Sequence, residues 1–325
     1  MSTPGLNQGT VDQLRRDLLA GAGHVQTGRQ VIQAWELSAV ERLFLADGRS
    51  IVYKAAAAPF TGEAAVLRAL GEHGAAVPVL HGYAIHNRTL GMLMDDLGDP
   101  LRPPTAAEAA AAAAQVHALP PLSMLPAFDQ AALARLPEQA IDALAALRQQ
   151  ARFLNTDLVE ELLEKLAKVA RSRAGGAERP PFGLCHGEFH PTSLHVSRTG
   201  CHLVDWAKAF TGPGLLDLAT WFGTRTPAKP GRLARLIHAY INAGGHPDAA
   251  TDRGGLPAAQ WALGWHRVWA AWWYLTTAAT GHHRPDTDQR HHQIVLRQLL
   301  GAAQLLAVAL PATTSWRSME TGRPS

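Results

Sequence analysis

The amino-acid sequence predicts an α+β protein with two lobes, a small β-rich N-terminal lobe and a larger, mainly helical C-terminal lobe. Residues 29–97 consist mostly of short β-prone runs between turn residues, with one helix among them. From Thr105 onward, long runs with helical periodicity dominate. The polar segment 95–100 lies between these two regions and is typical of a linker. We therefore expect one lobe over residues 1–97, including an N-terminal helix, and a helical lobe over residues 98–325.

The composition is that of a folded protein, and no secretion signal is expected. The 325 residues are 47% hydrophobic and 18% charged, which argues against disorder and allows a substantial core. Two cysteines make no disulfide framework, and no charged segment followed by an apolar run opens the chain, so we expect a cytoplasmic protein. The alanine-rich stretch 106–114 contains Glu108, which predicts a helix with no membrane partner. With a net charge of +3 and scattered arginines, we expect no nucleic-acid partner.

The strands of the N-terminal lobe begin with a hairpin. Asp47 and Gly48 form a typical two-residue hairpin turn between two β-prone runs. A short amphipathic helix is expected over residues 61–70, with a threonine near its start. Strands are expected over residues 31–37, 42–45, 50–54, 77–80 and 90–94.

The helical lobe contains one interruption, a strand–loop–strand region at residues 183–206. Thr105 and Glu108 have the spacing of a capping box at the start of the first helix. The tail after Pro311 is polar and is expected to be frayed. Helices are expected over residues 105–118, 131–153, 157–173, 215–222, 231–243, 258–280 and 290–309.

Lys54 and Glu63 form the first candidate site feature. Lys54 ends an apolar strand, and Glu63 follows nine residues later in the next helix. In this arrangement the carboxylate can hold the ammonium group over nucleotide phosphates. Taken alone, the two residues are better explained as a surface lysine and a solvated helix glutamate.

The segment 186–193 (HGEFHPTS) forms the second feature. It lies between two short apolar strands, and Asp205 is expected to end the strand that follows. Ser193 and Asp205 are oxygen donors that suit Mg²⁺, while Glu188 at the loop apex can reach a bound hydroxyl group. The alternative is a polar hairpin loop followed by an unrelated acid.

The order of these residues resembles the aminoglycoside phosphotransferase and choline kinase-like family. The segment 186–193 is similar to that family's H-G-D-x-H-x-x-N loop, and 204–206 (VDW) to its I-D-W motif. The segment 211–219, with Asp217, resembles its G-D-P-x-x-D-L-A motif. The resemblance covers residues 29–305 and implies a bilobal protein kinase-like fold, ATP or GTP and Mg²⁺ as cofactors, and phosphoryl transfer to a hydroxyl group of a small molecule.

The resemblance also implies residue roles. Lys54 and Glu63 would hold the nucleotide phosphates, Glu188 would orient the acceptor hydroxyl group, and His186 and Asp217 would brace the loop. A nucleotide-covering loop is expected over residues 36–41. Further contacts are expected from Ser38, Met94 and Asp95 to the nucleotide, and from Asp205 and Ser193 to the metal.

Two positions depart from the family pattern. Glu188 stands where the family has aspartate, and Ser193 where it has asparagine, although the neighbouring Thr192 offers a second hydroxyl group. The longer glutamate moves the carboxylate by about an ångström, and misplacement on that scale can be costly to catalysis. Two hypotheses therefore remain, an active kinase and a catalytically impaired pseudokinase that binds nucleotide or another ligand.

The acceptor is expected to be a neutral or anionic compound, such as a sugar, a nucleoside or an antibiotic-like natural product. From Phe210 to Ser325, eleven basic residues outnumber six acidic ones, a poor match to a polycation. The helix over residues 258–280 is rich in tryptophan, which indicates a buried helix or, alternatively, an aromatic wall of the acceptor pocket. The candidate acceptor contacts are His190, Trp269 and Trp273.

Overall fold

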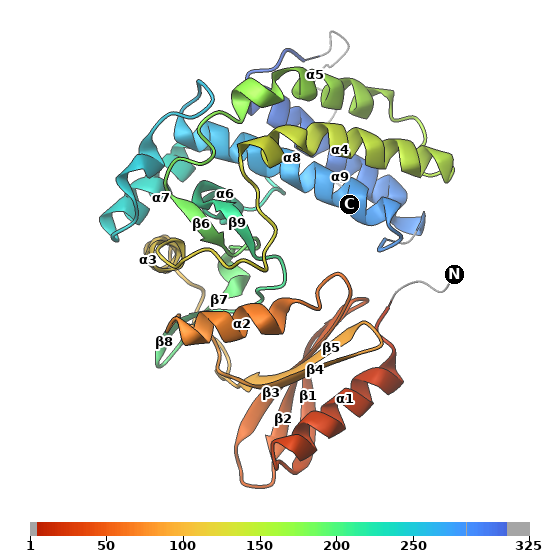
Figure 1. Ribbon diagram of the computed structural model, residues 1–325, viewed down its shortest axis with the longest axis vertical. Helices are drawn as coiled ribbons and strands as arrows, with labels where there is room; N and C mark the ends of the chain where they lie inside the picture. The colour runs from red at the N-terminus through yellow and green to blue at the C-terminus, as the bar shows by residue number, and fades with distance from the viewer. Residues whose placement is uncertain (1–4, 284, 311–325) are drawn as a thin grey trace, which may run out of the picture. The chain divides into compact units, whose positions relative to one another are not determined.

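An antiparallel sheet of five strands, in the order β1-β2-β3-β5-β4, fills the N-terminal part of the protein, and helices dominate the rest (Figure 1). The predicted α+β class is therefore confirmed. The computed structural model describes residues 5–283 and 285–310, so the expectation for the tail after Pro311 lies outside the described residues.

The described residues belong to two compact units. One comprises those of Met1–Asp129, Ala177–Gly223 and Gly231–Thr251. The other comprises those of Gln130–Gly176, Thr224–Pro230 and Asp252–Ser325. A division into lobes at residue 97 is a different partition of the chain and stays a prediction.

The two faces of the five-stranded sheet have different neighbours. The helix α1 (Gln8–Gly21) packs Val11 and Leu19 against residues such as Leu43 and Tyr53 on one face. Because side chains alternate along a strand, Lys54 lies on the opposite face. The strands are β1 (Gln26–Trp35), β2 (Ser38–Leu45), β3 (Ser50–Ala57), β4 (Leu80–His86) and β5 (Thr89–Asp95).

Three details of this sheet differ from expectation. The strand expected over 77–80 is wrong: β4 begins at Leu80, because Pro78 lacks the amide hydrogen that a strand ladder requires. The turn between β4 and β5 was not expected; it uses Asn87 and Arg88 at φ values of 48° and 59°. The loop expected over 36–41 is a two-residue turn, because Trp35 already pairs with Ser38.

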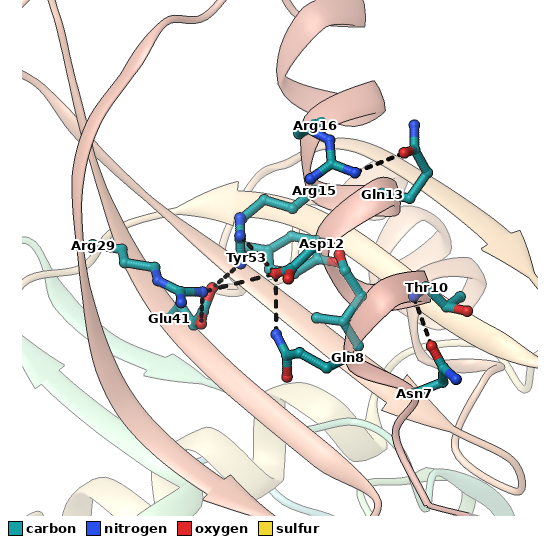
Figure 2. A network of polar contacts seen from close by, with 11 residues as sticks. Asn7, Gln8, Thr10, Asp12, Gln13, Arg15, Arg16, Arg29, Glu41 and Tyr53 are labelled. Atoms are coloured by element: carbon teal, nitrogen blue, oxygen red, sulfur yellow. Dashed lines mark hydrogen bonds and ion pairs between the residues drawn. The ribbon is translucent and has the colours of Figure 1, made fainter.

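A buried ion network fastens α1 to the sheet (Figure 2). The guanidinium group of Arg15 lies 2.7 Å from Glu41 Oε2 of β2 and 2.7 Å from Asp12 Oδ1 of its own helix. Arg29 of β1 contacts the other oxygen of Glu41 at 2.9 Å. The Tyr53 hydroxyl group donates to the Val11 carbonyl oxygen from the same side. Glu41 thus neutralises two arginines, one of them buried.

Replacing Glu41 with glutamine is expected to lower the free energy of unfolding by about 2–4 kcal/mol, because it leaves Arg15 with less than its full counter-charge in a buried setting. Urea denaturation of the two proteins measures the difference. Asp17→Asn, which changes an exposed carboxylate of the same helix that accepts a hydrogen bond from Gln13, is the matched control. Equal stability of the Glu41 variant and the wild-type protein would contradict this role.

Smaller elements complete the first unit. Strands β6 (Phe182–Cys185) and β9 (Phe210–Pro213) pair with each other, as do β7 (Leu194–Ser197) and β8 (Gly200–Leu203). The capping box of Thr105 and Glu108 is confirmed at the start of α3. The helices of this unit besides α1 are α2 (Glu63–Glu72), α3 (Ala106–His117), α6 (Gly214–Thr220) and α7 (Pro230–Asn242), with short 3₁₀ turns at Pro191–Ser193 and Pro247–Ala250.

The second unit is a group of long helices that lie side by side in Figure 1. Trp261 and Trp265 of α8 are fully buried, and both indole N–H groups donate to the Arg173 carbonyl oxygen, as the buried-helix interpretation predicts. Trp269 and Trp273 are only partly buried. The helices are α4 (Gln130–Gln149), α5 (Asp157–Arg173), α8 (Ala258–Ala279) and α9 (Asp288–Leu305), with a 3₁₀ turn at Pro285–Thr287. Across the described residues, none of the helices combines the length and apolarity that a membrane span needs.

Candidate active site

Lys54 is the centre of a three-residue ion cluster. Its Nζ atom lies 2.6 Å from Glu63 Oε2 of α2 and 2.7 Å from Asp205 Oδ1. The other oxygen of Glu63 accepts a hydrogen bond from the Trp206 backbone N–H at 3.1 Å. The structure therefore brings together one strand, one helix and the segment after β8, and the alternative of a surface lysine is excluded.

The charges in this cluster stabilise one another. Burial favours the neutral form of Lys54, but Glu63 and Asp205 outweigh it and raise the pKa of Lys54 above its ordinary value. Burial likewise opposes ionisation of Asp205, yet the charge of Lys54 prevails and lowers the pKa of Asp205. Burial raises the pKa of Glu63, with Lys54 opposing the rise. Lys54 and Asp205 are thus held in the charged forms that phosphate and metal binding need.

The prediction that Asp205 ends a strand is wrong. Strand β8 ends at Leu203, and Asp205 has a φ of 68°, in the left-handed region. Its side chain remains 49% exposed, although Lys54 and Trp206 beside it are buried. The turn thus leaves the carboxylate accessible while one of its oxygens faces the lysine.

His186 connects the 186–193 loop to the Asp205 segment. Its Nε2 atom lies 3.0 Å from the Val204 carbonyl oxygen, which can only accept, so Nε2 carries the hydrogen. Its Nδ1 atom accepts from the Glu188 backbone N–H at 3.2 Å. Burial lowers the pKa of His186, against the effect of Asp217, which agrees with this neutral form. The imidazole ring therefore sets the spacing of the two functional segments.

Asp217 of α6 fixes the start of the same loop. Its carboxylate oxygens accept from the backbone N–H groups of His186 at 2.6 Å and Gly187 at 2.9 Å, and the side chain is buried. Gly187 has a φ of 83°, and a Cβ atom there would overlap the Lys208 carbonyl oxygen. His117, a residue that sequence reasoning missed, lies 3.4 Å from Asp217 Oδ2.

Glu188 has an ion partner that sequence reasoning also missed. The Nζ atom of Lys208 lies 2.7 Å from Glu188 Oε1, and the two side chains are 16% and 26% exposed. Lys208 follows Asp205 by three residues, and that position was the only signal in the sequence. The candidate base and a second ammonium group therefore share one part of the site.

Ser193 is buried, and its hydroxyl group donates to the Glu188 carbonyl oxygen at 2.7 Å. His190 Nδ1 lies 2.9 Å from Thr192 Oγ1 and 3.3 Å from Ser193 Oγ. The Ser193 oxygen retains lone pairs for a metal ion while its hydrogen holds the loop in shape. Both roles suit a serine at this position.

Two of the three remaining nucleotide candidates lie on the Lys54 face of the sheet. Met94 pairs with Val52, and Ser38 pairs with Ala56. Directly opposed residues project to the same face, so both side chains share the face of Lys54. Asp95 belongs to the other face, where its carboxylate accepts from His81 Nε2 at 2.7 Å. Only the main chain of Asp95 is then available to a nucleotide.

The donor set fits a divalent metal ion and a nucleotide. A carboxylate that is half exposed and a hydroxyl group are the oxygen ligands that Mg²⁺ accepts, together with phosphates and water. Lys54 adds a fixed positive charge beside them. Of the candidate acceptor contacts, His190 belongs to the loop, and Trp269 and Trp273 belong to the second unit.

Comparison with known proteins points to the same chemistry. The model of the phosphotransferase enzyme family (APH) matches residues 34–254, more than half of the chain. No curated protein matches the sequence.

Solved structures with the same fold include two named phosphotransferases and a choline kinase. The macrolide 2'-phosphotransferase of Brachybacterium faecium is 18% identical, with a TM-score of 0.60 over 89% of this chain and 98% of that one. The choline kinase of Cryptosporidium parvum is 11% identical, with a TM-score of 0.61 over 93% and 97%. An aminoglycoside-3'-phosphotransferase of type VIII is 22% identical, with a TM-score of 0.52 over 81% and 98%. These similarities confirm the protein kinase-like fold, and the family match establishes that the chain belongs to the phosphotransferase enzyme family.

Proposed function

We propose that the protein is a small-molecule kinase that transfers the γ-phosphoryl group of ATP or GTP to a hydroxyl group, with Mg²⁺. The observation that carries the proposal is the position of Lys54, which contacts Glu63 and Asp205 at 2.6 and 2.7 Å. That arrangement places a fixed cation next to an accessible carboxylate, as phosphoryl transfer requires. We place this activity in the cytoplasm.

Each residue of the site has a separate role in the proposed reaction. Lys54 binds nucleotide phosphates, while Asp205 and Ser193 hold Mg²⁺, which when bound neutralises phosphate charge. Glu188 accepts a hydrogen bond from the acceptor hydroxyl group and orients its oxygen toward the γ-phosphorus. The new P–O bond forms as the bond to the β-phosphate oxygen breaks, and the hydroxyl proton passes to Glu188 and then to water. His186 and Asp217 hold the loop in shape throughout.

The proposed acceptor is a neutral or anionic hydroxyl compound. Proteins of this fold carry names that refer to macrolides, aminoglycosides and choline, so the fold does not choose the acceptor. The excess of basic over acidic residues after Phe210 disfavours a polycation. His190, Trp269 and Trp273 stay as candidate acceptor contacts.

A second candidate function, a pseudokinase, rests on two contacts. The Ser193 hydroxyl group is engaged with the loop carbonyl of Glu188, and the Glu188 carboxylate is engaged with Lys208. A protein that kept these contacts in the presence of substrates would bind nucleotide and leave it unchanged.

One experiment separates the two functions. We expect Mg²⁺ with ATP or GTP to raise the melting temperature, and a panel of hydroxyl compounds to reveal an acceptor that the wild-type protein phosphorylates. The variant Glu188→Asp/Ser193→Asn restores the family's residues and serves as the comparison. Phosphorylation by the variant alone would identify the natural protein as the impaired form. No stabilisation by either nucleotide would refute both the kinase and a pseudokinase that binds nucleotide.

A further inference from the structure

Lys208 was not predicted as a site residue, but the structure places it beside the candidate base. Its ammonium group is 2.7 Å from Glu188 Oε1, and its side chain is only 16% exposed. The Lys208 carbonyl oxygen lies so close to Gly187 that a side chain at position 187 would overlap this oxygen. Both ends of Lys208 are therefore held against the loop that carries the candidate base.

An aromatic ring also lies near the same ammonium group. The Nζ atom is 5.9 Å from the centre of the buried Phe60 ring, within the range of a cation–π contact. Trp35, the last residue of β1, packs edge-on against Phe60 with ring centres 5.7 Å apart. The ammonium group thus has an aromatic neighbour in addition to Glu188.

We propose that Lys208 is a second phosphate-binding cation, which holds Glu188 in the free protein and moves to the terminal phosphate of a bound nucleoside triphosphate. The inference rests on the proposed kinase function. Lys54 is already shared by two carboxylates, so a second ammonium group would add to the positive charge that a triphosphate meets.

Electrostatics explains why the exchange would occur when substrate binds. A terminal phosphate carries more negative charge than a carboxylate and offers three oxygens, so it competes for the ammonium group. Once Lys208 has moved, Glu188 Oε1 is free to accept the hydrogen bond of the acceptor hydroxyl group. The ion pair thus keeps the base occupied until a triphosphate is present.

The test compares nucleotides that differ only in the terminal phosphate. Calorimetry with Mg²⁺ measures the affinity for ADP and for the β,γ-imido analogue of ATP. Lys208→Met is expected to weaken binding of the analogue about tenfold and to leave binding of ADP within about twofold, because only the analogue has the phosphate that Lys208 contacts. Lys208→Arg retains the charge and should retain most of the preference. Lys165→Met, which removes a lysine paired with Glu161 on α5, is the matched control.

Glu188→Gln supplies a second test, in which the affinity for the ATP analogue is expected to change in the opposite direction. It frees Lys208 from its carboxylate, so affinity for the ATP analogue is expected to rise about threefold while that for ADP stays constant. Equal changes for the two nucleotides in both variants, or no change in either, would overturn the role of Lys208 and leave the kinase assignment intact. Failure of the wild-type protein to bind either nucleotide would instead refute the proposed function, and this inference with it.

Discussion

Replacing Asp205 with asparagine is expected to reduce nucleotide-dependent phosphoryl transfer by about 1,000-fold. Asparagine keeps the shape of the side chain but removes the charge that binds the metal ion. It also removes half of the negative charge around Lys54, whose ammonium group contacts Asp205 and Glu63. Both effects act on the metal ion and the phosphates directly, so we expect a large loss of activity from this single substitution.

Asparagine is a better test substitution than alanine because of the backbone conformation at position 205. Asp205 has a φ of 68°, a conformation that asparagine adopts more readily than alanine. The melting temperature of Asp205→Asn should therefore stay close to that of the wild-type protein. Transfer of labelled phosphate to the identified acceptor measures the effect, with Asp99→Asn as a control in a carboxylate that is 87% exposed. Unchanged turnover in Asp205→Asn would remove the metal-binding role from this residue.

Replacing Asp217 with alanine is expected to lower the free energy of unfolding by about 3 kcal/mol and to abolish activity. The substitution leaves the backbone N–H groups of His186 and Gly187 without their acceptors in a buried setting. Each buried donor left unpaired costs about 1–3 kcal/mol. Because these residues begin the loop, the positions of Glu188 and Ser193 would be lost with them.

Urea denaturation and the turnover assay together test this role. Asp157→Ala, a change in a fully exposed side chain of α5, is the control and should alter stability by less than about 0.5 kcal/mol. A stable but inactive Asp217→Ala protein would assign Asp217 a direct part in the chemistry. A stable and active one would contradict any part for it in the loop.

Local patterns in the sequence predicted most helices and the central part of the site. The periodicity of α5 and α8 and the capping box of α3 depend on residues within a few positions of one another, so the chain carries this information locally. The spacing within 186–193 and 204–206 likewise located Glu188, His186 and Asp205. The predicted element bounds were wrong where a single residue changes the backbone, as Pro78 does before β4.

The partners of several charged side chains, in contrast, were decided by the tertiary structure. Lys54 and Asp205 are 151 positions apart in the chain, and Arg15 and Glu41 are 26 apart. Lys208 carries no motif, and only the structure shows its backbone close to Gly187 and its ammonium group beside Glu188. A short-range pattern specifies hydrogen bonds and periodicity within one element, whereas an ion pair between two elements depends on how those elements are packed. Most residues of the candidate site could therefore be proposed from the sequence, but the ion pair that we propose controls its base could not.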